Sequence, residues 1–417
     1  MDYILKNKDK EVLRFSVKVV ESRVQGSDEP TPSRTEEILQ NIVIADKNLL
    51  PLGLDTHDVE NALTQWIQKR KVPKNREFVE KIVATYVNAP QKLMDYVNVS
   101  LALSLNDSYW IVPADGDYRW QDYNLYHNTF SKALELAAFG VQDYRASGIE
   151  TSPEYTTNGM LKKCWHREDS TIYLYKGSSR IYHKNAEAFS EYYMAQVAHA
   201  LGFECVSYDL REFHNDIVSA CPIFTSENEG YVPMHQCLQT NRSFHNDKNA
   251  LIGEIIKVYD KAKFQDMMLF DALIGNTDRH LGNFGMIIDN NTNALLRPAP
   301  IFDNGLSLMT TITPTELHAP QLALNRITTY FDLGCDEQLG YFVQKRHLQA
   351  LENLSTFTFT KHPRYNLPDS VLEPINAFLN ARALKAITMF QDKTKTIAKT
   401  QDTPKEIKNP TNKPKRR

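Results

Sequence analysis

The sequence predicts an α+β protein made of more than one folded unit. Its 417 residues exceed what one ordinary hydrophobic core holds, so two or three units are expected. Segments with the two-residue alternation of β-strands are concentrated before Phe224, whereas helical spacing dominates after Ala250. Hydrophobic residues make up 42% of the chain and charged residues 24%, a balance typical of soluble globular proteins.

Residues 1–150 are expected to form a separate N-terminal domain. Short apolar runs on both sides of Asn7-Lys8-Asp9 predict a β-hairpin over residues 2–20. Two stretches with helical spacing and one aromatic, strand-like stretch follow, at residues 59–71, 76–87 and 110–120. The sequence of this region shows no catalytic constellation.

A second unit, residues 151–240, and a third, residues 241–391, are expected to follow. The second reads strand, strand, helix, strand, strand, with a strand opening at Gly159 and further elements at residues 171–176, 186–201, 205–213 and 216–224. The third is mostly helical, with helices at residues 264–274, 339–354 and 371–391 and a hairpin over residues 286–297. The basic tail, residues 392–417, has no apolar periodicity and is predicted to be disordered.

Composition disfavours several classes of protein. No pair among the five cysteines has C-x-x-C spacing, which argues against a cysteine-rich zinc site and predicts reduced thiols in a cytoplasmic protein. The charged N-terminus lacks an apolar signal segment, and no stretch approaches the roughly 18 apolar residues of a membrane span, so none is predicted. The net charge of −3 argues against nucleic-acid binding, except through the basic tail.

The most informative stretch runs from Gly275 to Asn283, between a predicted helix and a predicted hairpin. Phosphoryl transfer needs a carboxylate that accepts the proton of the attacking hydroxyl, and an oxygen ligand for Mg²⁺. Kinase catalytic loops supply both with an Asp-x-x-x-x-Asn spacing, which Asp278 and Asn283 have here. Asp303 follows an apolar pair and precedes Gly305, as the second Mg²⁺ carboxylate of a kinase does. Either motif alone is most often a turn, but the two in this order predict a kinase site.

The unit before this motif is expected to hold ATP. Lys176 ends a predicted strand on the same face as Ile172 and Leu174, and a core-facing lysine needs a partner. Glu191 lies among small residues on the following predicted helix and is the natural partner, since kinases pair a strand lysine with a helix glutamate. The alternatives are a lysine that reaches solvent at a strand end and an exposed helix glutamate.

The phosphate-binding loop is less clearly marked, because neither G-x-x-x-x-G-K-[ST] nor G-x-G-x-x-G is present. The run Thr156-Thr157-Asn158-Gly159, before the first predicted strand, is the candidate through its backbone N–H groups and hydroxyls, with Thr157, Asn158 and Gly159 as the expected nucleotide-binding residues. A plain hairpin turn is the alternative. His280 has no second histidine at metal-ligand spacing, so it is expected to orient the loop by hydrogen bonding rather than to bind zinc.

These residues resemble the HipA kinase family, in particular its CtkA-like branch. The similar segments are Asn276–Asn283 and Ala299–Leu308 for the catalytic half, and Gly159–Lys163, Tyr173–Gly177 and Ser190–Tyr192 for the small lobe. The leading region, with Tyr109–Trp120 and Tyr126–Asn128, resembles that of bacterial HipA-domain proteins without an assigned function. The resemblance implies a two-lobed protein-kinase-like fold with an additional N-terminal α+β domain. Residues 151–240 would be the ATP-binding lobe and residues 241–391 the catalytic lobe.

By position, the resemblance implies Ser/Thr phosphorylation that depends on ATP and Mg²⁺. Lys176 would bind the α- and β-phosphates, Asp278 would be the catalytic base, and Asn283 and Asp303 would bind Mg²⁺. The segment Ser219–Phe224, which includes Ala220, Cys221 and Ile223, would form the hinge beside adenine. The resemblance also implies a protein substrate and leaves open an antitoxin-like partner.

Two other functions compete with this one. Asp-Arg-His-x-x-Asn also occurs in phosphoinositide kinases, whose anionic substrates require basic residues after the metal-binding Asp. Residues 304–325 contain no Lys or Arg, and their threonines suit a protein substrate or autophosphorylation of this loop: Thr310, Thr311, Thr313 and Thr315. The second competitor is a non-catalytic regulatory module, and the intact set of kinase residues argues against it.

Overall fold

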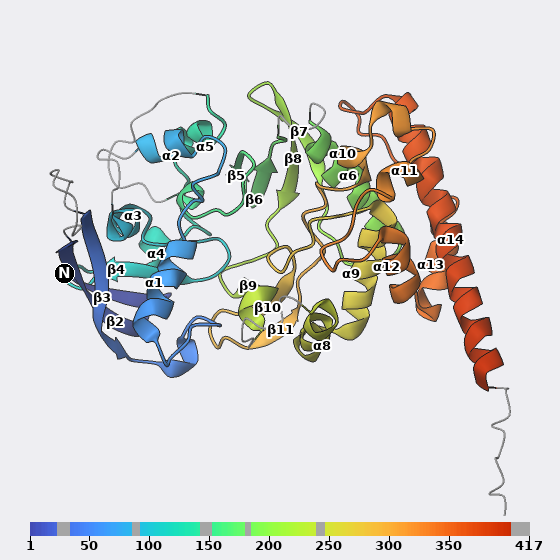
Figure 1. Cartoon of the computed structure of the whole chain (residues 1–417). Helices are drawn as coiled ribbons and strands as arrows, with labels where there is room; N and C mark the ends of the chain where they lie inside the picture. The colour runs from blue at the N-terminus through green and yellow to red at the C-terminus, as the bar shows by residue number, and fades with distance from the viewer. Residues whose placement is uncertain (23–33, 86–91, 142–151, 180–184, 239–246, 402–417) are drawn as a thin grey trace, which may run out of the picture.

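The computed structural model describes the chain except for residues 23–33, 86–91, 142–151, 180–184, 239–246 and 402–417. Its elements follow one long axis, from a β-sheet at the N-terminus to a group of helices that ends in the long helix α14 (Figure 1). Within the described ranges, no helix has both the length and the apolar character needed to cross a membrane. The mixture of sheets and helices agrees with the predicted class.

The first sheet is antiparallel and contains the predicted N-terminal hairpin. Its strands are β1 (Asp2–Asn7), β2 (Lys10–Ser22), β3 (Arg34–Ile44) and β4 (Tyr109–Pro113), in the order β3-β2-β1-β4. Helices α1 (Val59–Lys69) and α3 (Leu93–Ser100) bury Leu63, Ile67, Met94 and Val97 against this sheet. Strand β3 and helix α3 had no counterpart in the sequence prediction.

A second antiparallel sheet carries Lys176. Its strands are β5 (Lys163–Glu168), β6 (Thr171–Lys176), β7 (Asp209–Phe213) and β8 (Asp216–Pro222), in the order β5-β6-β8-β7, and helix α6 (Ala186–Ala200) follows β6. The first strand begins at Lys163 and not at Gly159 as predicted, since Gly159 has a φ of +96° that lies outside the β region. Helix α6 ends at Ala200, and Gly202, whose φ is +72°, turns the chain just after the C-cap Leu201.

The N-terminal region packs directly on this second sheet. Helices α2 (Val79–Ala84) and α5 (Lys132–Ala138) bury Ile82 and Leu134 against Tyr175 and Val218 of the strands. On the opposite face, Ile172 belongs to a cluster formed mainly by residues before 130, including the short helix α4 (Trp120–Tyr123). The N-terminal region and the second sheet therefore share hydrophobic clusters. The boundary expected near residue 150 lies outside the described residues.

The remaining chain forms a helical core and a small sheet. The longer helices are α8 (Lys248–Val258), α9 (Lys261–Ile274), α12 (Cys335–Phe342), α13 (Leu348–Leu354) and α14 (Asp369–Gln401). The short helices are α7 (Met234–Cys237), α10 (Leu308–Thr311) and α11 (Gln321–Leu324), and the sheet joins β9 (Glu229–Pro233), β10 (Gly285–Asp289) and β11 (Leu295–Pro298).

Two expectations for this half need correction. The helix predicted over residues 339–354 is two helices, because Val343 and Gln344 have extended backbone and separate α12 from α13. Helix α14 continues to Gln401, beyond the start predicted for a disordered tail. Residues 402–417 lie outside the described part of the chain.

One short N-terminal segment, Leu103–Asn106, links three distant parts of the structure through its carbonyl groups. Thr156 Oγ1, just before the second sheet, donates to Leu103 O at 2.5 Å. Thr225 Oγ1, which follows β8, donates to Leu105 O at 2.5 Å. The amide of Tyr231 in β9 donates to Asn106 O at 2.6 Å. The segment therefore ties the β5–β8 sheet to the β9–β11 sheet.

Candidate active site

Lys176 is held between two carboxylates. Its Nζ, at the end of β6, lies 2.8 Å from Oε1 of Glu191 on α6. The same Nζ also contacts Oδ1 of Asp303. Only 1% of the Glu191 side chain and 12% of the Lys176 side chain are exposed, so neither of the solvent-exposed alternatives is realised. The fold thus brings together residues from three separate segments that were predicted to share a site.

Burial and ion pairing set the charges in this cluster. Burial alone lowers the pKa of Lys176, but Asp303 and Glu191 outweigh it, so the pKa is raised and the side chain stays an ammonium. Burial alone raises the pKa of Asp303, but the positive charges of Lys176 and Lys163 bring it well below its usual range. For Glu191, burial outweighs Lys176 and the pKa is raised. Lys176 is therefore the cation that both carboxylates share.

The backbone around Asp303 is fixed by its neighbours. Asp303 has a φ of +57°, in the left-handed region that Asp tolerates better than most residues. Its amide donates to Tyr208 Oη at 3.0 Å, and the next amide, of Asn304, donates to Glu191 Oε2 at 2.7 Å. A Cβ on Gly305 would lie 3.3 Å from Glu191 Oε1, so only glycine leaves full room for the carboxylate.

Asp278 and Asn283 face each other across the predicted catalytic loop. Asn283 Nδ2 donates to the carbonyl of Asp278 at 2.8 Å and approaches its carboxylate Oδ2 at 3.4 Å. The Asp278 amide donates to Asn276 Oδ1 at 2.9 Å, which fixes the loop from the other side. Burial and, next, the negative charge of Asp303 raise the pKa of Asp278. The two carboxylates therefore lie within electrostatic range of each other.

Arg279, which the sequence analysis did not single out, holds these segments together. It is 1% exposed, and its Nη2 donates to Asp271 Oδ1 at 2.9 Å and to Asn304 Oδ1 at 2.8 Å. Its Nη1 donates to Asn283 O at 3.1 Å and also to Phe302 O. Asp271, a buried acidic residue between apolar neighbours on α9, was the sequence signal that pointed to such a cation.

His280 is exposed and binds its own loop. Its Nδ1 accepts the amide hydrogen of Gly282 at 2.9 Å, which is the hydrogen-bonding placement expected from the sequence. Among the described residues, no group of three or more His, Cys, Asp or Glu side chains is arranged to hold a metal ion. A site with fewer protein ligands, completed by a bound phosphate, remains compatible with this arrangement.

Lys163 is a further buried lysine, on the same sheet face as Lys176, that the prediction missed. It lies directly opposite Lys176 in the β5–β6 register, so both side chains are on one face of the sheet. Its Nζ lies against Gly159, and no hydrogen bond or ion pair of this Nζ is found within the described residues. Burial, together with the charges of Arg76 and Lys176, lowers the pKa of Lys163 to about 7. Lys163 lies two residues before Trp165, so strand alternation places both side chains on the same face of the sheet. This spacing is the sequence signal that could have identified Lys163.

The residues predicted to lie beside adenine are divided between the two faces of the sheet. Cys221 pairs with Leu174 in the β6–β8 register and shares the face of Lys176. Ala220 lies on the other face, buried with Tyr175. Ile223 packs instead against the N-terminal cluster that includes Ile172.

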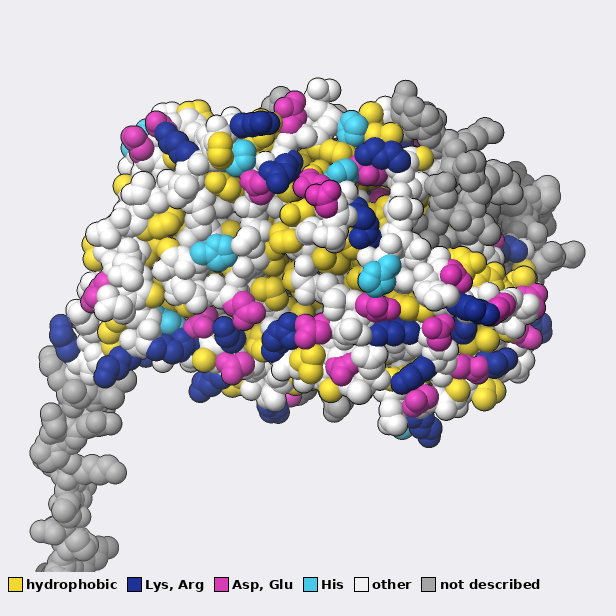
Figure 2. Space-filling model, turned by 180° about the vertical axis from the view of Figure 1, so that it is seen from behind, with side chains coloured by type: hydrophobic (Ala, Val, Ile, Leu, Met, Phe, Trp, Pro, Cys, Tyr) yellow, Lys and Arg dark blue, Asp and Glu magenta, His cyan; other side chains and the backbone are white. Residues whose placement is uncertain are grey.

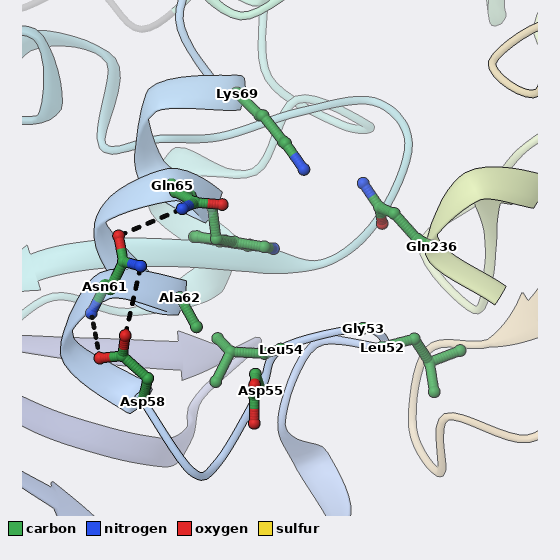
Figure 3. Close-up of a pocket in the computed structure, with 11 residues that line it drawn as sticks. Leu52, Gly53, Leu54, Asp55, Asp58, Asn61, Ala62, Gln65, Lys69 and Gln236 are labelled. Atoms are coloured by element: carbon green, nitrogen blue, oxygen red, sulfur yellow. Dashed lines mark hydrogen bonds between the residues drawn. The ribbon is translucent and has the colours of Figure 1, made fainter. Parts of the chain in front are cut away.

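Other surfaces lie apart from this cluster. A hollow of about 210 Å³ between α1 and α7 is lined by none of the predicted site residues. Lys69 and Gln236 point toward each other across it (Figure 3). Among the described residues visible on the reverse side of the molecule, Lys and Arg are interspersed with Asp and Glu (Figure 2).

Comparison with known proteins places the chain in a family. The curated serine/threonine-protein kinase CtkA of Helicobacter pylori strain J99 is 30% identical over 131 residues, 29% of this chain and 40% of the relative, so the chain spans about two fifths of that protein. The crystal structure of the H. pylori proinflammatory kinase CtkA has a TM-score of 0.44 and 19% identity, and the match covers 59% of this chain and 96% of that one. A chain in the Shewanella oneidensis MR-1 toxin–antitoxin complex of HipA, HipB and operator DNA has a TM-score of 0.48 and 13% identity. That match covers 92% of this chain and 97% of the other. The HipA-like C-terminal domain matches residues 146–357, which is half of the chain, and the chain therefore belongs to the HipA-like C-terminal domain family.

Proposed function

We propose that this chain transfers a phosphoryl group from ATP, with Mg²⁺, to a serine or threonine hydroxyl of a protein. The observation that carries the proposal is the convergence of Lys176, Glu191 and Asp303 in one buried cluster, within electrostatic range of Asp278. A strand lysine fixed by a helix glutamate, a base and two metal ligands are the parts that protein kinases use. The identity with a protein named as a Ser/Thr kinase supports the same class of reaction.

The oxygen donors of the cluster fit Mg²⁺. Asn283 uses its Nδ2 in hydrogen bonds to Asp278, which leaves its Oδ1 for a cation. Asp303 is ionised and 31% exposed, so its carboxylate is accessible from solvent. One or two protein oxygens suffice, because Mg²⁺ keeps several waters and takes phosphate oxygens as further ligands. Bound by Asn283 and Asp303, Mg²⁺ would neutralise charge that develops on the transferred group.

The protein's own side chains supply the remaining functions. The raised pKa of Asp278 makes its carboxylate a better acceptor for the proton of the substrate hydroxyl. Lys176, oriented by Glu191, would donate to the α- and β-phosphates. Lys163 would add a second cation on the same face of the sheet. In this proposal residues 151–240 form the ATP-binding lobe and residues 241–391 the catalytic lobe.

The surroundings of the site favour a protein substrate over a phosphoinositide. The first Lys or Arg after Asp303 is Arg326, and its Nη2 is paired with Glu316 Oε2 at 2.7 Å. It is therefore already neutralised and is a poor ligand for an anionic head group. Thr313 and Thr315 are exposed in this segment and are the hydroxyls available for autophosphorylation, whereas Thr310 is buried. A cytoplasmic location, predicted from the cysteines, and an antitoxin-like partner, implied by the family resemblance, stay predictions.

The decisive experiment is mass spectrometry of the purified chain after incubation with Mg-ATP, alone, with a generic protein substrate and with phosphoinositide vesicles. We expect phosphate on Ser or Thr residues of protein, none on the lipid, and no transfer when the metal is chelated. Transfer to the lipid alone would favour the lipid-kinase alternative. A chain that binds Mg-ATP but transfers nothing in any of the three mixtures would favour the non-catalytic module.

A further inference from the structure

Arg76 belongs to the N-terminal region, yet it lies buried beneath the candidate phosphate loop. It is 2% exposed. Its Nη1 donates to the carbonyls of Thr157, Asn158 and Gly159 at 3.4, 3.3 and 3.1 Å, and its Nη2 donates to the carbonyl of Lys163 at 2.7 Å. One guanidinium therefore binds the backbone from the loop to the first residue of β5.

The adjacent backbone extends this contact. The amide of Glu77 donates to the carbonyl of Met160 at 2.8 Å, and the amide of Val72 donates to the carbonyl of Tyr155 at 2.8 Å. The segment 72–77 thus runs along the loop and donates hydrogen bonds to its carbonyl groups. A loop on which so many acceptors are bound from one side has little freedom to turn over.

The orientation of the carbonyls fixes the orientation of the amides. In a trans peptide the carbonyl oxygen and the following N–H point to opposite sides of the chain. Because the carbonyls of residues 157–159 face Arg76, the N–H groups of Asn158, Gly159 and Met160 face away from it. No acceptor for these three N–H groups is found within the described residues. Consecutive N–H groups that point the same way form a concave anion-binding site.

The charges nearby favour an anion at the same place. Arg76 is bound to neutral carbonyl oxygens, and in the described part of the chain no carboxylate lies within ion-pair distance of it. Lys163, whose Nζ lies against Gly159, adds a second positive charge that is likewise without a carboxylate partner there. Glu154 and Glu77 act on Arg76 only from beyond ion-pair distance, as Asp303 and Glu191 act on Lys163. In its ammonium form, Lys163 therefore adds to the positive electrostatic potential of Arg76 around the loop.

We propose that Arg76 is a positioning residue for the phosphates of the nucleotide. It holds Thr157–Gly159 in the conformation in which the loop amides bind the terminal phosphates, without touching the nucleotide itself. This inference rests on the proposed kinase function. It extends that function by making a residue outside the family's matched segment, residues 146–357, a working part of the ATP site.

The test compares the affinities of the full chain for Mg-ATP and for adenosine, which has no phosphates. Arg76→Gln removes most of the hydrogen bonds that fix the loop. We expect it to weaken Mg-ATP binding on the order of tenfold while adenosine binding changes by less than about twofold. Arg76→Lys keeps the charge but reaches fewer carbonyls, so it should raise the ratio of the two dissociation constants by a smaller amount, roughly threefold.

Arg70 provides a matched control. It lies in the same region, its side chain is 9% exposed, and it pairs with Asp107 at 2.7 Å. Its other hydrogen bonds go to the carbonyls of Ala102 and Tyr109, so within the described residues it binds no carbonyl of the loop itself. Arg70→Gln should destabilise the N-terminal region without changing the ratio of ATP to adenosine affinity. Thermal melting of each variant separates loss of fold from loss of binding.

An unchanged ratio in Arg76→Gln, or equal losses for both ligands, would overturn the proposal. If Arg76→Gln does not fold, Arg76→Lys decides by the same ratio. A wild-type chain that does not bind Mg-ATP would overturn the kinase function and this inference together. Wild-type binding with an unchanged ratio in the variants counts against Arg76 alone.

Discussion

Asp303 contacts the rest of the site through its side chain, through its backbone and through the residue that follows it. Its carboxylate meets Lys176, its amide meets Tyr208, and its neighbour Asn304 meets Glu191. The left-handed φ of +57° places these groups in three directions at once. Asp and Asn both tolerate this conformation, so the charge at this position can be changed without changing the backbone.

Asp303→Asn should therefore keep the fold but lose Mg²⁺-dependent nucleotide binding, because the amide is a weaker ligand than the carboxylate. We expect the enhancement of ATP affinity by Mg²⁺ to fall by at least roughly tenfold, measured by calorimetry with and without the metal. Asp332 is a matched control, with a φ of +59° and a side chain that is 74% exposed. If Asp303→Asn responded to Mg²⁺ as Asp332→Asn does, the metal role would be wrong.

Asp278→Asn should separate chemistry from binding. Loss of a general base lowers turnover by about 10²- to 10⁴-fold, whereas nucleotide affinity should stay within a few-fold of wild type. Radiolabel transfer and ATP titration measure the two quantities. Asp117→Asn, at a surface position with an 82% exposed side chain, should leave both unchanged. Near-native transfer by Asp278→Asn would refute the role of this carboxylate.

The lowered pKa of Lys163 predicts that nucleotide affinity depends on pH. Burial lowers its pKa to about 7, so in the free protein the side chain loses its proton as the pH rises through this value. Phosphate favours the ammonium form and raises the pKa, so binding above pH 7 should take up a proton, and affinity should fall as the pH rises. Calorimetry in two buffers of different ionisation enthalpy measures the uptake.

The neighbouring lysine is the control for this measurement. Lys163→Met should abolish most of the proton uptake at pH 8. Lys162→Met should not, because Lys162 Nζ is paired with Asp216 Oδ2 at 2.6 Å. Equal uptake by wild type and Lys163→Met would show that another group titrates.

At the level of elements, α9 and the catalytic loop are joined by one buried ion pair. Arg279 and Asp271 have side chains that are 2% and 1% exposed. Removing one partner of such a pair leaves an unpaired buried charge and costs about 3–5 kcal/mol. Arg279→Ala should lower the free energy of unfolding by this amount in urea titrations. Arg297→Ala, which removes a 47% exposed partner of Glu229, should cost less than about 1 kcal/mol.

The elements that the sequence predicted well are those with local signals. Strand β6 has the predicted bounds, and the ends of α6 and α9 are followed by Gly202 and Gly275, whose φ values are +72° and +69°. Alternation, helical spacing and a glycine stop are all properties of neighbouring residues. The same holds for the residues that carry the site motifs, since Lys176, Glu191 and Asp303 do lie together.

The missed features depend on distant residues. Arg76 looks like an ordinary surface cation in the sequence, and only its burial against the carbonyls of residues 157–159 and 163 distinguishes it. Strand β3 is defined by its pairing with β2, which local propensity does not encode. The interruption between α12 and α13 places His347 against Asp266 of α9, another contact between distant segments.

At the scale of the whole molecule, the N-terminal region and the β5–β8 sheet share one core. Leu134→Ala in α5 should therefore destabilise the sheet, by about 2–5 kcal/mol for a fully buried leucine. Hydrogen exchange should become faster in β6 and β8. Leu63→Ala in α1 removes an equally buried side chain from the first sheet's core and should leave exchange in β6 and β8 unchanged. Equal effects of the two variants would indicate a single cooperative unit.

The carbonyl contacts of Leu103–Asn106 have a consequence for how the chain tolerates changes of length. Because this segment binds Thr225 and Tyr231, the spacing between the two sheets does not depend only on the covalent connection from Pro222 to Glu229. Extra flexible residues in a connection cost little, since loop-closure entropy grows only slowly with length. The length of Leu103–Asn106 itself cannot change in this way, because adding or removing one residue would move its carbonyl groups away from Thr225 and Tyr231. Insertions should therefore be tolerated between Pro222 and Glu229 and should be destabilising within Leu103–Asn106.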